Sequence, residues 1–298
     1  MKSLKLVIVA IMIFFTSNCC KSQQVEFQYI KNQLVIPVFI EGKGPYKMLL
    51  DTGVDPSVID LGLTKYLGMH VDSTNFGKAE GRGTDVIKVY PVKINELSIS
   101  DKNYYGIDAL AMNLGHLGEP LGVNLNGILG YSFLKDKIFK IDYQKHLLEF
   151  YNSRSELEAS FKGEKYIIHF FYDGEDRIPL INKLLVNGLE FTGSVDTGSS
   201  LNIQIYDHFL DTYKINIDST KVSRIIGARG NKKTFRSNIE SFKIGGFVFS
   251  NQEVTISSIK NEDQLRSGNI GNRFLQNFYV GFDYTNNELI FEKIGSTN

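Results

Sequence analysis

Two Asp-Thr-Gly triplets are the residues whose types and spacing are suited to chemistry. They are Asp51-Thr52-Gly53 and Asp196-Thr197-Gly198, so the two Asp residues are 145 positions apart (196 minus 51). Carboxyl groups serve as general acids and general bases, one accepting a proton while another donates one. A single triplet would occur by chance in roughly one chain of this length in twenty. Whether the two triplets are functional therefore has to be judged from the sequence around them.

Each triplet must be positioned by the apolar segments that precede it. Residues 34–40 and 46–50 flank a Gly-rich turn and lead into Asp51. In the same way, residues 178–186 and 189–195 flank Asn187-Gly188 and lead into Asp196. Apolar runs separated by a short turn predict a β-hairpin. We therefore expect each Asp at the end of the second strand of a hairpin.

The similarity between the two halves continues beyond the triplets. A short helical stretch is expected at 60–68 and again at 206–213. An apolar segment containing Gly then follows in each half: Ile128-Leu129-Gly130 and Asn269-Ile270-Gly271. Such self-similarity, with short strands separated by Gly and Asn, predicts a duplicated all-β protein. We expect an N-terminal lobe at 25–152, a linker at 153–165 with a short helix, and a C-terminal lobe at 166–298.

The duplication leaves one structural alternative open. Gly adopts turn conformations that other residues avoid. Two triplets at equivalent positions are thus also compatible with a duplicated turn that has no chemical role.

These motifs resemble the aspartic peptidase family, whose pepsin-like members carry two D-T-G lobes in one chain. The resemblance covers both triplets and both downstream Gly segments. The compact lobes and the exported start of this chain look more like the bacterial relatives of retropepsins than like full pepsins. The resemblance implies a bilobal acid protease fold, with two β-barrel-like lobes and short helices.

The resemblance also assigns roles to residues. Asp51 and Asp196 would form a catalytic pair that shares one proton and activates water. The residues implied to support the pair are Gly53 and Gly198 through their backbone, Thr52 and Thr197 across the lobe interface, Ser199 as a donor to Asp196, and Gly130 and Gly271 in strands beside the catalytic loops. Gly53 and Gly198 would let backbone N–H groups approach the carboxylates.

The first loop departs from the pepsin pattern. Val54 replaces a hydroxyl residue, as in retropepsins, and Asp55 adds a negative charge. Both changes favour protonated carboxyls, which predicts an activity optimum less acidic than that of pepsins. Two functions remain open: an aspartic endopeptidase, or a catalytically silent protein that binds peptides with the same fold.

Composition restricts the partners. The 33 basic and 33 acidic residues balance, which argues against a nucleic-acid binder. The five His residues lack metal-ligand spacing, and we expect no cofactor and no metal. We expect a peptide or protein substrate and a monomer, because both half-sites lie in one chain.

The N-terminus predicts export. Lys2 and Lys5 precede the apolar run 6–15, typical of a signal peptide at 1–22. Cys19 and Cys20, the two cysteines of the chain, follow this run. Three outcomes are compatible with this position: one of the two cysteines is lipidated after cleavage, both are removed with the signal peptide, or both remain unpaired. We expect a periplasmic, lipid-anchored or secreted protein, with membrane contact only through a lipid.

Two loops complete the expectations. The region 76–90, around Gly81-Arg82-Gly83, is the best candidate for a flap over the substrate. The Gly-rich stretch 115–130 is expected to be a mobile loop.

Overall fold

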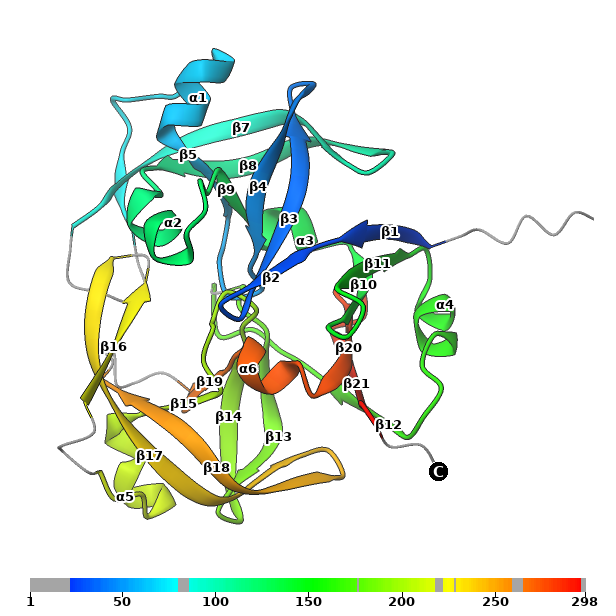
Figure 1. The fold of residues 1–298 in the computed structure, drawn as a ribbon, viewed down its shortest axis with the longest axis vertical. Helices are drawn as coiled ribbons and strands as arrows, with labels where there is room; N and C mark the ends of the chain where they lie inside the picture. The colour runs from blue at the N-terminus through cyan, green and yellow to red at the C-terminus, as the bar shows by residue number, and fades with distance from the viewer. Residues whose placement is uncertain are drawn as a thin grey trace, which may run out of the picture.

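The computed structural model describes residues 22–79, 86–175, 177–217, 222–227, 229–258 and 265–295. Strands dominate these residues, and they form two lobe sheets and one sheet shared by both halves (Figure 1). The expected all-β, bilobal fold is thereby confirmed. No helix in the described ranges is both long and apolar enough to cross a membrane.

The first-lobe sheet has the strand order β2-β3-β4-β9-β5-β8-β7-β6. Its strands are β2 (Gln28–Ile30), β3 (Gln33–Ile40), β4 (Lys43–Leu50), β5 (Ser57–Asp60), β6 (Gly77–Lys78), β7 (Lys88–Ile99), β8 (Lys102–Met112) and β9 (Gly127–Leu129). The hairpin β3–β4 ends directly before Asp51, as expected. β9 runs parallel to β4 and antiparallel to β5, so its C-terminal end lies beside the Asp51 loop.

The second-lobe sheet repeats this arrangement, with the order β13-β14-β19-β15-β18-β17-β16. Its strands are β13 (Leu180–Val186), β14 (Leu189–Val195), β15 (Ile203–Tyr206), β16 (Val222–Gly227), β17 (Gly230–Ile244), β18 (Phe247–Ser257) and β19 (Gly268–Ile270). Here β19 runs parallel to β14 and antiparallel to β15. Each strand from β13 to β19 thus has a counterpart in the first lobe.

A third sheet joins the two halves, in the order β1-β11-β10-β20-β21-β12. Its strands are β1 (Gln23–Glu26), β10 (Ile138–Asp142), β11 (Leu147–Tyr151), β12 (Lys165–His169), β20 (Phe278–Asp283) and β21 (Glu288–Lys293). The central pair, β10 and β20, places Lys140 opposite Gly281. These positions are equivalent in the duplicated sequence, so the repeat relates the two sides of the sheet. Figure 1 shows the sheet to one side of the two lobes.

Short helices connect the strands. They are α1 (Leu61–Leu67), α2 (Gly115–Leu121), α3 (Tyr131–Leu134), α4 (Arg154–Ala159), the 3₁₀ turn η1 (Asp207–Phe209), α5 (Leu210–Tyr213) and α6 (Asn272–Leu275). The two helical stretches expected after the triplets are confirmed. α1 begins where the Asp60 carboxylate accepts the N–H groups of Gly62 and Leu63, and it ends at left-handed Gly68 (φ 71°). α4 lies within the expected linker.

The expectation of a loop over 115–130 is wrong for its first half, which forms α2. The helix ends at Gly122 in a left-handed conformation (φ 75°), whose N–H donates to carbonyls of the last turn. The Leu114 N–H before the helix donates to Asp60 Oδ2 (3.1 Å). Leu114 and Leu125 are buried on either side of it. Burial of the flanking leucines compensates for the poor helix propensity of Gly and Pro.

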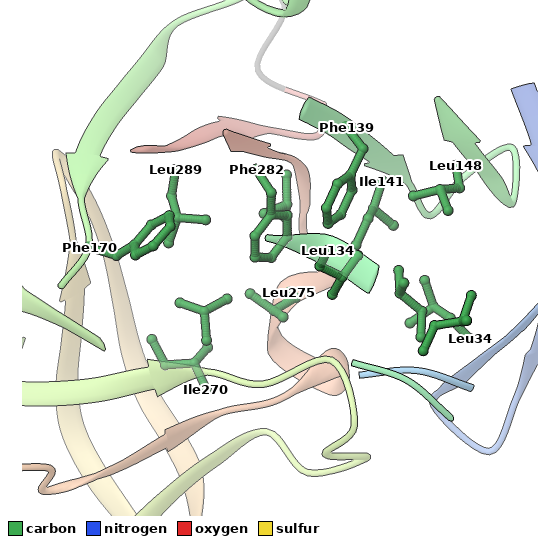
Figure 2. Close-up of a cluster of buried hydrophobic side chains, with 14 of the residues drawn as sticks. Leu34, Leu134, Phe139, Ile141, Leu148, Phe170, Ile270, Leu275, Phe282 and Leu289 are labelled. Atoms are coloured by element: carbon green, nitrogen blue, oxygen red, sulfur yellow. The ribbon is translucent and has the colours of Figure 1, made fainter. Parts of the chain in front are cut away.

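The largest apolar core extends through both lobes and the shared sheet. Figure 2 shows its centre, where Phe139 and Phe282 of the shared sheet lie near Leu275 of α6 and Ile270 of β19. The Phe139 and Phe282 rings stack with centroids 4.9 Å apart. A continuous core of this kind fixes the two lobes relative to each other, which the site between them requires.

Candidate active site

Both Asp residues follow buried strand ends and are held by the neighbouring Gly segment. The Asp51 N–H donates to the Leu129 carbonyl of β9 (3.0 Å), and the Asp196 N–H donates to the Ile270 carbonyl of β19 (2.9 Å). Leu50 and Val195, which precede the two Asp residues, are fully buried. The carboxyl-bearing residues themselves are partly exposed. Each lobe thus presents one partly solvated carboxyl group on a rigid base.

The two loops are joined by reciprocal hydrogen bonds between Thr52 and Thr197. The Thr52 hydroxyl donates to the Val195 carbonyl (2.6 Å) and accepts the Thr197 N–H (3.0 Å). The Thr197 hydroxyl donates to the Leu50 carbonyl (2.9 Å) and accepts the Thr52 N–H (3.0 Å). Both side chains are buried, where hydrogen bonds are not exchanged with water. These four bonds set the position of one loop against the other.

The glycines of the triplets lie against the carboxyl group of the opposite lobe. A Cβ atom on Gly53 would lie 2.6 Å from Asp196 Oδ1, and one on Gly198 would lie 2.0 Å from Asp51 Oδ2. The Gly53 N–H also donates to Asp51 Oδ1 (2.7 Å). Glycine is therefore required at both positions because the opposite carboxyl group occupies the space of a side chain. The structure brings Asp51 and Asp196 into one site.

Gly130 and Gly271 lie beside the residues that follow the triplets. A Cβ on Gly130 would lie 2.7 Å from Val54 Cγ1, and one on Gly271 would lie 2.7 Å from the Ser199 carbonyl oxygen. Close backbone approach at these two positions leaves no room for a larger residue. The Gly segments thus pass directly beside the two loops.

Ser199 lies in the second loop, where the resemblance implies a hydrogen bond to Asp196. It is buried, and its N–H donates to the Asp196 carbonyl oxygen (3.1 Å). The bond from its hydroxyl to the carboxylate stays a prediction. Val54, at the equivalent position of the first loop, is partly buried, whereas Asp55 is exposed. Solvent therefore screens the charge of Asp55.

Sequence analysis missed Asn269, which contacts a carboxylate directly. Its side-chain Nδ2 donates to Asp196 Oδ2 (3.1 Å). The signal was present in the aligned Gly segments, where Asn269 stands in place of Ile128. Asn272 was also missed: its Nδ2 donates to the Thr197 carbonyl (2.5 Å) and to the Asn32 carbonyl (2.9 Å).

The β2–β3 turn of the first lobe supports the second loop from outside. Gln33 Nε2 donates to the Gly198 carbonyl (2.8 Å), and Asn32 Nδ2 donates to the Ser200 carbonyl (3.2 Å). These bonds connect residues more than 160 positions apart. They add to the Thr52–Thr197 contacts in fixing the Asp196 loop against the first lobe.

The surroundings of Asp51 are aromatic. Burial raises the pKa of Tyr284 well above its usual value, and the charges of Tyr172 and Asp51 act in the same direction. Tyr131, which follows Gly130, packs against Tyr284 and Tyr172 with ring centroids 6.2 and 5.8 Å away. The Tyr284 hydroxyl is buried and has no hydrogen-bond partner within the described part of the chain.

The remaining candidates lie outside this site or outside the described residues. β6 and β7 form the base of the expected flap hairpin, with Gly77 opposite Val89. Its tip, including Gly81-Arg82-Gly83, lies outside the described residues, as do Cys19, Cys20 and the rest of the expected signal peptide. Within the described ranges, no group of three or more His, Cys, Asp or Glu residues is arranged to hold a metal ion.

Comparison with known families finds a match. The sequence profile described as aspartyl protease matches residues 36–133 and 183–274, which together are more than half of the chain. Each matched region contains one Asp-Thr-Gly triplet and ends just beyond the corresponding Gly segment. No curated protein matches the chain.

Proposed function

Because the chain belongs to the aspartyl protease family, we propose that it is an aspartic endopeptidase in which Asp51 and Asp196 together activate a water molecule. The observation that carries this proposal is the reciprocal contact of the triplets. Gly53 lies against the Asp196 carboxyl group, and Gly198 lies against that of Asp51. Such an arrangement is needed for two carboxyl groups to share a single proton.

The proposed reaction needs no other side chain. The ionised carboxylate takes a proton from water as the oxygen attacks the scissile carbonyl carbon, and the protonated partner donates its proton to the carbonyl oxygen. The tetrahedral diol then collapses: the C–N bond breaks, and the nitrogen receives the proton taken from water. A diol hydroxyl returns a proton to the second carboxylate, which restores the starting state.

The roles of the supporting residues follow from their contacts. Thr52 and Thr197 hold the carboxyl groups in register through their four buried bonds. Positional errors of about 1 Å in catalytic groups reduce rates by about two orders of magnitude. We further propose that an extended peptide lies between the lobes beneath the β6–β7 hairpin, and that one chain suffices for activity.

The test is cleavage of a diverse pool of unfolded peptides between pH 3 and 8, with and without pepstatin. Wild type is compared with Asp51→Asn and Asp196→Asn, and with Asp108→Asn as a matched control. Asp108 is an exposed aspartate on the first-lobe sheet. We expect wild type and the control to cleave, and both dyad variants to be inactive.

Failure of folded wild type to cleave at any pH would favour the silent peptide-binding protein instead. The feature that favours this alternative is the first loop, where Val54 provides no hydroxyl and Asp55 adds charge. Retained binding of pepstatin by an inactive wild type would support it. Activity that both Asp variants retain would exclude the proposed mechanism.

Export is a separate proposal that rests on residues 1–22. We propose cleavage of a signal peptide, with Cys19 or Cys20 as the site of any lipid anchor. Mass spectrometry of the mature N-terminus distinguishes an acylated cysteine from a peptide that begins beyond Cys20. An intact Met1 on protein from the native host would contradict export by this route.

A further inference from the structure

Asn269 stands at the end of a buried chain of polar side chains that leads to Asp196. Its Nδ2 donates to Asp196 Oδ2 (3.1 Å) and to Gln204 Oε1 (3.3 Å). Gln204 Nε2 in turn donates to the Ser257 hydroxyl. Asn269, Gln204 and Ser257 are at most 3% exposed. A buried amide that contacts a catalytic carboxylate is therefore part of the site.

The orientation of the Asn269 amide is fixed by its partners. Its Oδ1 accepts the Ser194 hydroxyl (2.6 Å) and the Tyr206 hydroxyl (3.4 Å). The two hydroxyl groups could also accept, but an ionised carboxylate can only accept, so the NH₂ group must face Asp196. A flipped amide would direct its oxygen at a carboxylate oxygen and its NH₂ at two hydroxyl groups. The network thus commits Asn269 to donate to Asp196.

The first lobe has no side-chain donor at the position equivalent to Asn269, although the Gly53 N–H donates to Asp51 Oδ1 (2.7 Å). Ser194 and Gln204 both stand opposite Asn269 in the sheet. The corresponding residues of the first lobe are Leu49 and Val58, which both stand opposite Ile128. All three are buried in an apolar cluster. An apolar side chain at position 128 cannot donate a hydrogen bond to Asp51.

We propose that Asn269 is a positioning residue that orients the Asp196 carboxyl group and stabilises its ionised form. This inference rests on the proposed function. A hydrogen bond to a carboxylate stabilises its charged form.

Other charged and titratable groups stand on both sides of the pair. The Asp51 carboxyl group lies across the lobe interface from Asp196. Because two adjacent carboxylates repel each other, only one of the two carboxyl groups carries a charge. On the second-lobe side, Tyr206 donates to Asn269, and the Arg266 guanidinium lies 5.8 Å from the Tyr206 ring centroid. On the Asp51 side stand buried Tyr284 and exposed Asp55, and the Arg177 guanidinium lies 5.6 Å from the ring centroid of Tyr172, which packs against Tyr131. Cationic groups thus lie on both sides of the pair, and the Asn269 amide is the contact that the test addresses.

The first test is the pH–rate profile of Asn269→Leu, a substitution of nearly equal size. Loss of the donor makes the pair easier to protonate, so the acidic limb of kcat/KM is expected to move to higher pH by about one unit. Ser194→Ala is the matched control, because it removes a bond from the same network and keeps the donor on Asp196. Its acidic limb is expected to stay in place. An unmoved limb in active Asn269→Leu would overturn the proposal.

A second measurement does not depend on activity. A bond to an ionised carboxylate stabilises the folded protein at pH values where that carboxyl group is ionised in the unfolded chain, above about pH 5. This contribution disappears as pH falls and the native group becomes protonated. The loss of Tm in Asn269→Leu should therefore be larger at pH 7 than at pH 3.5, by about 2–4 °C. Ser194→Ala should lose the same Tm at both pH values.

These two measurements separate the possible failures. If wild type cleaves nothing, the proposed endopeptidase activity fails, while the pH dependence of Tm still tests the contact with Asp196. If wild type cleaves and the Tm loss of Asn269→Leu is equal at both pH values, Asn269 is a packing residue and the inference is wrong.

Discussion

The two lobes share one topology but differ in the layer directly behind their Asp-Thr-Gly loops. Behind Asp51 this layer is apolar, with Leu49, Val58 and Ile128 at equivalent strand positions. Behind Asp196 the same positions hold Ser194, Gln204 and Asn269, joined by hydrogen bonds. The strands keep their register in both lobes. The side chains of one layer can therefore change from apolar to polar while the backbone frame stays the same.

The contacts between the lobes show the opposite behaviour. Thr52 and Thr197 make the same bonds in mirrored fashion, within a few tenths of an ångström. Such contacts must satisfy both lobes at once, so a change on one side leaves a buried group of the other side unpaired. Symmetry is thus expected at the interface, and divergence is expected behind it.

The largest expected effect comes from adding a methyl group at the interface. Gly198→Ala would place its Cβ 2.0 Å from Asp51 Oδ2, and Gly53→Ala would place its Cβ 2.6 Å from Asp196 Oδ1. Displacement of either carboxylate is expected to reduce kcat/KM by at least about 100-fold. The control is Gly163→Ala, whose Cβ would make an ordinary contact at 3.4 Å. Near-normal activity of Gly198→Ala would contradict the close packing of the two loops.

The next effect concerns the reciprocal threonines. Thr52→Val and Thr197→Val each remove a buried hydroxyl that makes two hydrogen bonds. Each is expected to lower the free energy of unfolding by about 2–4 kcal/mol, because a buried N–H and a buried carbonyl lose their partner. Urea unfolding measures this. The double variant should lose less than the sum, because the two residues share one network. Clearly unequal losses would show that the interface is not symmetric.

How much the sequence predicted can be judged from particular elements. The hairpins before Asp51 and Asp196 were predicted correctly, because alternating apolar residues and turn signals are local features. α1 was predicted for the same reason, since Asp60 and Gly68 mark its two ends. α2 was missed, because Gly115, Gly118 and Pro120 disfavour a helix and only burial of the neighbouring leucines overrides this preference.

The sequence singles out the two Asp residues that the structure brings into one site, but it indicates only some of the residues that hold them in place. Because the chain is duplicated, its two Asp-Thr-Gly triplets are expected at equivalent positions of the two lobes. Asn269 was not assigned, because its difference from Ile128 in the aligned Gly segments does not tell where the side chain points. Only the pairing of β19 with β14 and β15 places it behind Asp196. Gln33 was missed because its partner, the Gly198 carbonyl, is 165 positions away in the sequence.

The smallest expected effects come from an equivalent pair of buried tyrosines, Tyr143 and Tyr284, which directly follow β10 and β20 of the shared sheet. The Tyr143 hydroxyl donates to Asn272 Oδ1 (2.8 Å). At the equivalent place near Tyr284 the first lobe has Tyr131 instead of Asn, and the Tyr284 hydroxyl has no partner among the described residues. Tyr143→Phe should cost about 1 kcal/mol, whereas Tyr284→Phe should be neutral or slightly stabilising. Chemical denaturation of both variants checks this. An equal loss in both would mean that the Tyr284 hydroxyl is satisfied in solution.

The most direct measurement of the central claim is a double-variant cycle on the two carboxyl groups. It compares kcat/KM of wild type, Asp51→Asn, Asp196→Asn and the variant that carries both substitutions, on one peptide chosen from the cleavage pool. If the two residues act as one unit, each single variant should lose at least about 1,000-fold, and the double variant should be no more than a few-fold worse. The account would be contradicted if either single variant kept more than about a tenth of wild-type activity, or if the two losses multiplied in the double variant.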